Sequence, residues 1–244
     1  MVIVALALTS LRLDPPRGDV AEERVSAWAS RCGPPWHTIL SRLRFGIASL
    51  SDRTRCIFMT AYDRNALMQL LRSEALQFGE FTLASGKTAS YYLDCRRLTL
   101  HPQGANLIAA GMLERIEREP PLPAAVGGMA IGADPITAAI VTVAGQRALP
   151  LKGFMVRKEP KGHGMGRQVE GPVEPGQQVV IVEDVITSGG SALQAVEAAQ
   201  AFGLKVTKVI GIIDRLAGGE EAFQAAGLPL ETLFTVRDFG IDPE

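Results

Sequence analysis

The stretch VVIVEDVITSGGSA, residues 179–192, begins with four branched aliphatic residues, continues through two adjacent acids, and ends in hydroxyl-bearing residues and glycines. Four consecutive branched aliphatics indicate a strand that is covered on both faces, as in a parallel sheet. Glu183 and Asp184 are therefore expected to emerge at the carboxyl end of this strand. Open α/β sheets bind their ligands at that edge.

The residues after the acids have the composition of an anion-binding loop. Thr187, Ser188 and Ser191 carry hydroxyls, while Gly189 and Gly190 permit close approach of the backbone just before a predicted helix. The N-terminus of a helix adds N–H groups and the positive end of its dipole, which suits a phosphomonoester. The neighbouring carboxylates suit the two vicinal hydroxyls of a ribose. Taken alone, the acid pair has an alternative interpretation as a solvated strand end beside a helix cap.

Strands and helices alternate along most of the remaining chain. The segment 60–76 has leucines at helical spacing with Asp63 as its predicted cap, and 78–102 is rich in β-forming residues around a Ser-Gly-Lys turn. Further helices are predicted at 106–119, after the glycines near 127–132, at 191–203 and at 221–227, with strands at 124–126, 151–158, 178–185 and 205–214. This order predicts the α/β class, with a parallel sheet covered by helices on both faces.

Composition limits the class of protein and its partners. The chain has 244 residues, enough for one large domain or a domain with an appendage, and its net charge of −1 gives no field to recruit nucleic acid or anionic lipid. Its three cysteines, Cys32, Cys56 and Cys95, lie far apart without CxxC spacing, which is typical of a cytoplasmic protein. The apolar run in the first residues is too short to span a membrane, so no membrane partner is expected.

Residues 1–58 differ in composition from the rest of the chain. They contain eight arginines, no lysine and both tryptophans, and prolines and glycines interrupt them so that no regular period is sustained. We hypothesise that the functional chain begins at Met59. On this interpretation, the preceding residues are an atypical extension, either non-native or disordered.

A basic loop is predicted at 157–171, RKEPKGHGMGRQVEG, directly after a strand. Glycines at alternate positions prevent regular structure, and the loop is basic enough to fold over a pyrophosphate; a solvated basic loop is the alternative. Its potential cations are Arg157, Lys158, Lys161, His163 and Arg167.

Three segments carry a resemblance to a known family. Residues 179–192 resemble the phosphoribosyl pyrophosphate motif of the type I phosphoribosyltransferases. Residues 81–97, FTLASGKTASYYLDCRR, resemble the hood segment of the orotate phosphoribosyltransferases, and 157–171 resembles the mobile catalytic loop of that family. The resemblance covers nearly all of 59–240. It implies a type I phosphoribosyltransferase fold with a small amino-terminal hood at about 59–104 and a core at about 105–240.

The resemblance also implies an activity and a set of site residues. The expected reaction transfers the phosphoribosyl group of phosphoribosyl pyrophosphate to orotate in a cytoplasmic homodimer that shares the loop 157–171 between subunits. The expected cofactor is Mg²⁺, held mainly by substrate oxygens, so no residue is assigned as a metal ligand. Lys161, His163 and Asp184 are the expected catalytic residues. The expected substrate-binding residues are Lys87, Tyr91, Tyr92, Arg157, Lys158, Glu183, Val185, Ile186, Thr187, Ser188, Gly189, Gly190, Ser191 and Arg215.

The base-binding end of the site is less well specified. By resemblance, Lys87 lies in the hood, where an ammonium suits the carboxylate of orotate, and Thr187 and Arg215 match positions that contact orotate. The alternation of a strand predicts that one of Tyr91 and Tyr92 faces the core and the other the base, without saying which. One departure from the family pattern is clear. Residues 129–132, Met-Ala-Ile-Gly, lack the lysine that some orotate enzymes place there.

Two alternative functions remain open from the sequence. One is a purine or uracil phosphoribosyltransferase, because the motif at 179–192 does not identify the acceptor base. The other is a non-catalytic transcription regulator that senses phosphoribosyl pyrophosphate and binds DNA through the arginine-rich extension. The extension lacks a convincing helix-turn-helix pattern, so no nucleic-acid partner is expected.

Overall fold

The computed structural model describes residues 61–82, 88–159 and 168–243. The chain divides into two units, Met1–Met59 and Thr60–Glu244, and every described residue belongs to the second. The hypothesis about residues 1–58 concerns a segment outside the described residues and stays a prediction. Within the described part of the chain, no helix combines the length and apolar character needed to cross a membrane.

A six-stranded sheet forms the centre of the fold, in the order β5-β4-β3-β6-β7-β8. Five neighbouring strands pair in parallel, and only the two-residue β5 at one edge is antiparallel. The strands are β3 (Ala125–Met129), β4 (Lys152–Val156), β5 (Val169–Glu170), β6 (Gln178–Ile186), β7 (Lys205–Asp214) and β8 (Leu230–Thr235). The predicted parallel α/β sheet is therefore confirmed.

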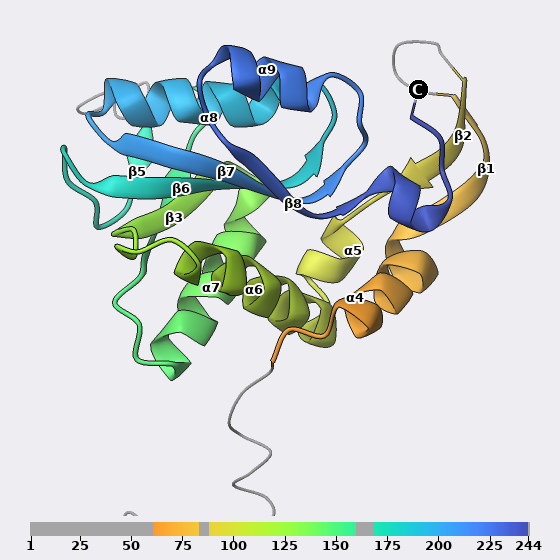
Figure 1. Cartoon of the computed structure of the whole chain (residues 1–244), viewed down its shortest axis with the longest axis horizontal. Helices are drawn as coiled ribbons and strands as arrows, with labels where there is room; N and C mark the ends of the chain where they lie inside the picture. The colour runs from red at the N-terminus through yellow and green to blue at the C-terminus, as the bar shows by residue number, and fades with distance from the viewer. Residues whose placement is uncertain (1–60, 83–87, 160–167, 244) are drawn as a thin grey trace, which may run out of the picture. The chain divides into compact units, whose positions relative to one another are not determined.

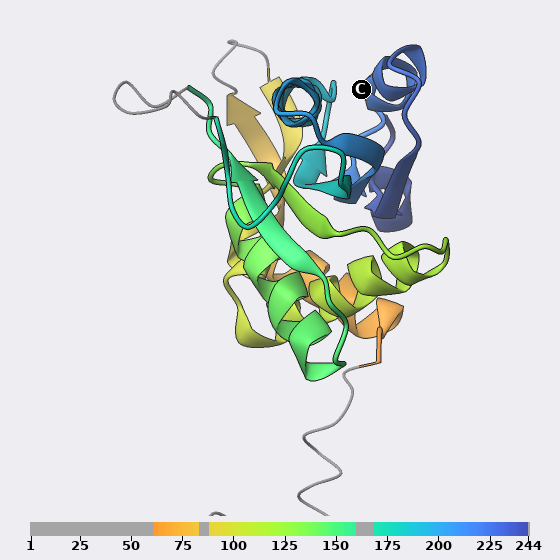
Figure 2. The ribbon, with the colours of Figure 1, turned by 90° about the vertical axis from the view of Figure 1, so that its left-hand side faces the viewer.

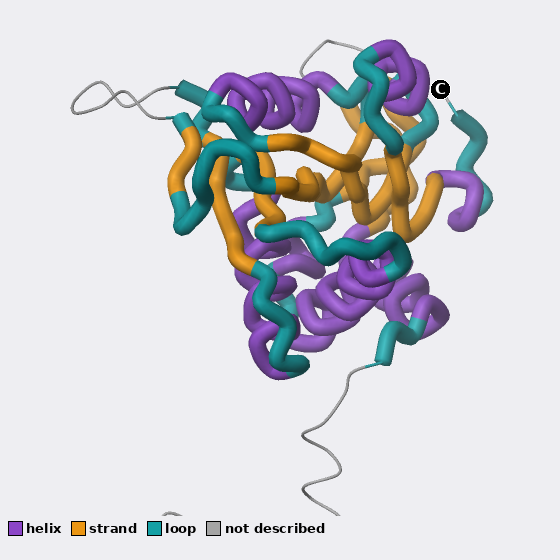
Figure 3. Tube along the Cα trace, turned by 60° about the vertical axis from the view of Figure 1, so that its left-hand side comes forward, coloured by secondary structure: helices purple, strands orange, loops and turns teal. Residues whose placement is uncertain are grey.

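Helices cover both faces of the sheet, as predicted (Figure 1). Helices α8 (Gly190–Ala201) and α9 (Gly219–Ala225) lie on one face, and α6 (Pro102–Glu117) and α7 (Ala133–Gln146) lie on the other. In Figure 3 the orange strands lie between these two groups of purple helices. Each face buries its own apolar cluster, because successive residues of a strand point to opposite sides.

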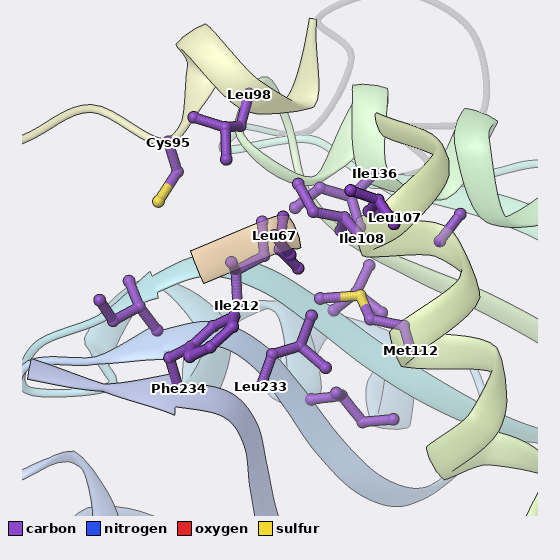
Figure 4. Packing of buried hydrophobic residues seen from close by; sticks show 14 of the residues in the cluster. Leu67, Cys95, Leu98, Leu107, Ile108, Met112, Ile136, Ile212, Leu233 and Phe234 are labelled. Atoms are coloured by element: carbon purple, nitrogen blue, oxygen red, sulfur yellow. The ribbon is translucent and has the colours of Figure 1, made fainter. Parts of the chain in front are cut away.

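Strand β6 shows why the motif at 179–192 specifies this arrangement. Val179 and Ile181 pack into the cluster under α8, while Val180 and Val182 pack into the cluster under α6 and α7, and all four are buried. Figure 4 shows the second cluster, in which Leu107, Ile108 and Met112 of α6 meet Ile212 and Leu233 of the sheet. A strand buried on both faces has to be apolar at every position, which explains the uninterrupted run.

The hood is a separate two-stranded antiparallel sheet beside the central one (Figure 2). Helix α4 (Arg64–Leu70) leads into it through a π-helical turn, Leu71–Ala75, and Asp63 caps α4 by accepting a hydrogen bond from the Ala66 N–H at 3.0 Å. The strands are β1 (Leu76–Thr82) and β2 (Thr88–Leu93), followed by the short helix α5 (Arg96–Thr99). The predicted cap is confirmed, and so are strands within the segment 78–102, although its last part forms α5 instead of strand. The Ser-Gly-Lys turn lies outside the described residues.

Candidate functional site

The site lies where the order of strands reverses. From β3 the chain passes through α7 to β4 on one side, and β6 pairs with β3 on the other side. Such a switch point leaves a crevice at the carboxyl ends of the two central strands, where ligands bind in open α/β sheets. The loop after β3 comes close to the acids of β6. A Cβ built on Gly132 would lie 3.4 Å from Asp184 Oδ1 and 3.5 Å from Glu183 Oε1.

Glu183 is the most perturbed group in this crevice. It lies inside β6, opposite Gly211 of β7, and is only 5% exposed. Its Oε2 atom is buried without a hydrogen-bond partner, and Oε1 accepts a long bond from the Asp184 N–H at 3.4 Å. Burial, together with the charge of Asp184, raises the pKa of the Glu183 carboxyl to about 8. The unliganded site thus holds an acid that lacks the partners a buried carboxylate normally has.

Asp184 points its carboxylate along the same edge of the sheet. Its Oδ1 accepts a hydrogen bond from the Val185 N–H at 2.9 Å. Behind it, the thiol of Cys95 is fully buried, and burial together with the charges of Asp184 and Asp94 raises its pKa well above the usual value. The thiol is therefore a neutral core group. The two acids lie within β6 near its carboxyl end, as expected, and pairing with β7 continues past them to Ile186.

A pocket of about 170 Å³ opens directly after the acids. Helix α8 begins here with Gly189 as its N-cap, and no side chain caps it, so its first N–H groups face the pocket without a side-chain acceptor. The residues that line the pocket are Glu183, Val185, Ile186, Thr187, Ser188, Gly189, Gly190, Ser191 and Ala192. The structure therefore brings together every residue that the sequence predicted for this loop.

Phe223 and Gly219, which sequence reasoning missed, support the loop from outside. Gly189 has φ = +78°, and a Cβ there would also lie 3.0 Å from the ring of Phe223 in α9. At Gly219 a Cβ would lie 2.4 Å from Ile186 and 3.0 Å from the carbonyl oxygen of Thr187. Helix α9 can therefore pack this closely only because Gly219 has no side chain. The signal in the sequence that could have indicated this close packing is the Gly218-Gly219 pair before the helix predicted at 221–227.

The two tyrosines of β2 differ as strand alternation predicts. Tyr91 is 3% exposed, and Tyr92 is 42% exposed with its ring 5.7 Å from that of Phe81. The Tyr91 hydroxyl accepts a hydrogen bond from Arg215 Nε at 2.7 Å, and the Arg215 guanidinium lies 4.7 Å from the centre of the Tyr91 ring. Tyr91 is thus the core-facing member of the pair, and it contacts a second predicted site residue.

The basic loop is described only at its two ends. Arg157 pairs with Glu170 across the β4–β5 ladder, with Nε 3.2 Å from Oε1, and the carbonyl oxygens of Arg157 and Lys158 accept from the Gln168 side chain. The predicted residues Lys161 and His163, and Lys87 of the hood turn, lie outside the described residues. Ile131 is 82% exposed in the loop 129–132, where the sequence lacks a lysine.

The carboxylate oxygens of the crevice suit a hard cation whose remaining ligands come from a substrate. Within residues 61–82, 88–159 and 168–243, no group of three or more His, Cys, Asp or Glu side chains could enclose a metal ion. The two adjacent carboxylates, one with an unpartnered buried oxygen, match the oxygen ligands that Mg²⁺ takes when a substrate supplies the remainder.

Comparison with known proteins identifies close relatives, although no family model matches the chain. The chain is 69% identical over 185 residues to the orotate phosphoribosyltransferase of Rhodopirellula baltica, covering 74% of this chain and 96% of that protein. It is 42% identical over 183 residues to the enzyme of the same name from Aquifex aeolicus, covering 74% and 99% of the two chains.

Solved structures agree with these relatives. The orotate phosphoribosyltransferase of Mycobacterium tuberculosis, in complex with Fe(III) dicitrate, matches with a TM-score of 0.66 at 40% identity over 73% of this chain and 99% of that one. The same enzyme in complex with 5-phospho-alpha-D-ribosyl 1-diphosphate matches with a TM-score of 0.62 at 35% identity, with the same coverage.

Proposed function

Because the chain belongs to the orotate phosphoribosyltransferase family, we propose that the crevice between β3 and β6 is its catalytic site. The protein is an enzyme that transfers the phosphoribosyl group of phosphoribosyl pyrophosphate to orotate, giving orotidine 5′-phosphate and pyrophosphate, in pyrimidine biosynthesis. One observation supports this location most directly. A buried, unpartnered Glu183 oxygen lies beside a pocket formed by the uncapped N-terminus of α8.

The acids hold the ribose in this proposal. Glu183 and Asp184 accept hydrogen bonds from the two vicinal hydroxyls of the sugar, which supplies the partner that Glu183 Oε2 lacks in the unliganded protein. Binding a hydroxyl donor favours the ionised form of the carboxyl, so its pKa falls when the sugar is bound. Asp184 is the proposed catalytic member of this pair. Its negative charge stabilises the positive charge that develops on the ribose ring.

The loop 187–191 binds the 5′-phosphate. The hydroxyls of Thr187, Ser188 and Ser191 and the N–H groups of the first turn of α8 donate to its oxygens. The positive φ of Gly189 turns the chain so that the N–H groups point into the pocket. These donors are held by the sheet before substrate arrives, so binding the phosphate orients the anomeric carbon for attack.

The base binds between the hood and the end of β7. Arg215 and Thr187 donate to the oxygens of orotate, and Lys87 pairs with its carboxylate. Arg215 lies next to the loop 187–191, because the Arg215 N–H donates to the Ile186 carbonyl at 2.8 Å. The exposed Tyr92 supplies an aromatic surface on the hood.

The basic loop acts on the leaving group. Lys161 and His163, assisted by Arg157 and Lys158, close over the pyrophosphate and supply positive charge or a proton to it as the bond to the anomeric carbon breaks. A ring nitrogen of orotate forms the new bond at that carbon. Because residues 129–132 offer no lysine, the pyrophosphate relies on this loop and on backbone N–H groups.

Mg²⁺ would be held mainly by oxygens of the substrate, with Asp184 and Glu183 as carboxylates beside that place. When bound, the ion neutralises charge on the leaving pyrophosphate. The enzyme is further proposed to work as a cytoplasmic homodimer in which the loop 157–171 reaches the neighbouring subunit, with the hood at about 59–104 and the core at about 105–240. The separate hood sheet and the wide spacing of cysteines support parts of this proposal.

The test is to incubate the enzyme with phosphoribosyl pyrophosphate, Mg²⁺ and each nucleobase in turn, and to follow pyrophosphate release. Pyrophosphate release is expected when the base is orotate and with no other base. Glu183→Ala and Asp184→Ala should abolish this release. Release by these variants at the wild-type rate would contradict the location of the site. Release with a purine or uracil instead would support the alternative phosphoribosyltransferase. If no base led to pyrophosphate release, the non-catalytic regulator would be supported.

A further inference from the structure

Arg215 lies on a turn whose backbone is held firmly against the catalytic sheet. Its N–H donates to the carbonyl of Ile186, the residue before Thr187, at 2.8 Å. On either side of it, Asp214 Oδ1 accepts from the Leu216 N–H at 2.8 Å, and Leu216 adopts φ = +55°. The backbone therefore fixes where the Arg215 side chain begins. It does not fix the plane of the guanidinium at the far end of three methylene groups.

The hood supplies a hydrogen bond and a ring contact that orient this plane. Tyr91 lies on β2 opposite Phe78, 124 residues away from Arg215 along the chain, and is almost fully buried. Its hydroxyl accepts from Arg215 Nε at 2.7 Å, and its ring lies 4.7 Å from the guanidinium carbon. A buried tyrosine has few accessible rotamers, so it offers Arg215 a rigid acceptor and a rigid aromatic face.

We propose that Tyr91 is a positioning residue for Arg215. A guanidinium is planar, so fixing the direction of its Nε–H and packing an aromatic ring against it also fix the directions in which its terminal N–H groups point. Those directions decide how well Arg215 matches the oxygens of orotate. The inference rests on the proposed role of Arg215 in binding the base, and it assigns Tyr91 an indirect role in place of direct stacking on orotate.

Through this contact, Tyr91 of the hood takes part in base recognition by orienting Arg215 of the core. The acids lie in β6, the loop 187–191 joins β6 to α8, and both bind the phosphoribosyl part of the substrate without help from β2. Loss of the Tyr91 hydroxyl is therefore expected to affect orotate selectively. A purely structural role would change the binding of both substrates, because both sites are built on the same core.

The direct test is Tyr91→Phe, which removes one oxygen and keeps the ring. Losing a hydrogen bond to a charged group is expected to raise the KM for orotate about tenfold, while the KM for phosphoribosyl pyrophosphate changes less than about twofold. Tyr62→Phe is the matched control, because Tyr62 also has a buried hydroxyl and a neighbouring arginine, Arg115, but lies outside the site. Unchanged orotate kinetics in Tyr91→Phe, or equal increases in both KM values, would overturn the proposal.

A double-mutant cycle separates positioning from direct contact. Titration calorimetry with orotidine 5′-phosphate is carried out on wild type, Tyr91→Phe, Arg215→Ala and the double variant. If Tyr91 acts through Arg215, adding Tyr91→Phe to Arg215→Ala weakens binding less than about twofold. A full tenfold loss in that background shows that Tyr91 acts by itself and refutes the proposal. Unchanged binding in Arg215→Ala would refute the role of Arg215, whereas absence of pyrophosphate release by wild type would refute the proposed function.

Discussion

Replacing Glu183 with glutamine is expected to stabilise the unliganded enzyme at neutral pH while it impairs catalysis. The carboxyl is buried beside Asp184, and its pKa is raised from 4.5 to about 8. Below about pH 4.5 it is protonated in both the folded and the unfolded chain, so it contributes no pH dependence. As the pH rises toward 8, the unfolded chain loses this proton and the folded chain keeps it. The wild type therefore loses stability over that window, and the glutamine variant does not.

The size of the effect follows from the same pKa. Each pH unit between 4.5 and 8 corresponds to about 1.4 kcal/mol of lost stability. Water penetration and relaxation around a buried acid reduce the full value, so we expect the variant to be more stable by ~3 kcal/mol at pH 7.5. For a domain of this size, such a difference raises the unfolding midpoint by roughly 6–12 °C.

The assay is thermal unfolding followed by circular dichroism and calorimetry between about pH 5 and pH 8, with EDTA present and without substrate. Glu197→Gln makes the same chemical change on the exposed side of α8 and is expected to alter stability by less than ~0.5 kcal/mol. Our reasoning would be refuted if Glu183→Gln matched or fell below the wild type throughout this range. A stabilisation of the same size at pH 5 and pH 8 would also contradict it, because the effect would then not come from ionisation.

Three further predictions concern the loop, the leaving group and the domain boundary. Gly189→Ala combines strain at positive φ with contact on Phe223, so it should lower the free energy of unfolding by ~2 kcal/mol and raise the KM for phosphoribosyl pyrophosphate. Gly176→Ala is the control, because Gly176 also has a positive φ but open space around it. A loss of stability as large as that of Gly189→Ala would show that the contact with Phe223 contributes nothing. Lys161→Ala is expected to lower turnover far more than it weakens orotate binding, and unchanged steady-state turnover would remove Lys161 from the mechanism. Residues 59–244 expressed alone should fold and keep full activity, whereas an insoluble or inactive product would show that residues 1–58 are required.

The core of the fold could be predicted because its signals are local. The apolar run 179–182 requires cover on both faces, and the strand predicted at 205–214 coincides with β7. Strand β8 and the two-residue β5 lie at the sheet edges, where fewer apolar residues are needed, and their sequences show no clear alternation. They were therefore missed. The strand predicted at 178–185 ends one residue before β6 does, and pairing with β7 continues past Glu183 and Asp184 to Ile186.

The loop of the site could also be predicted, since a continuous stretch of sequence supplies almost all of the pocket. Contacts between distant segments could not. The bond between Tyr91 and Arg215 joins residues far apart in the chain, and neither residue carries a signal for the other. The same is true of Gly219, whose lack of a side chain matters only because Ile186 and Thr187 lie against it.

The central claim is that the acids of β6 and the first turn of α8 bind the two ends of the same phosphoribosyl group. A crystal structure with phosphoribosyl pyrophosphate and Mg²⁺, in the absence of orotate, tests this most directly. We expect the ribose hydroxyls within hydrogen-bond distance of Glu183 and Asp184, and the 5′-phosphate enclosed by residues 187–191. Well-ordered ligand at another place, with this pocket filled only by water, would contradict the account.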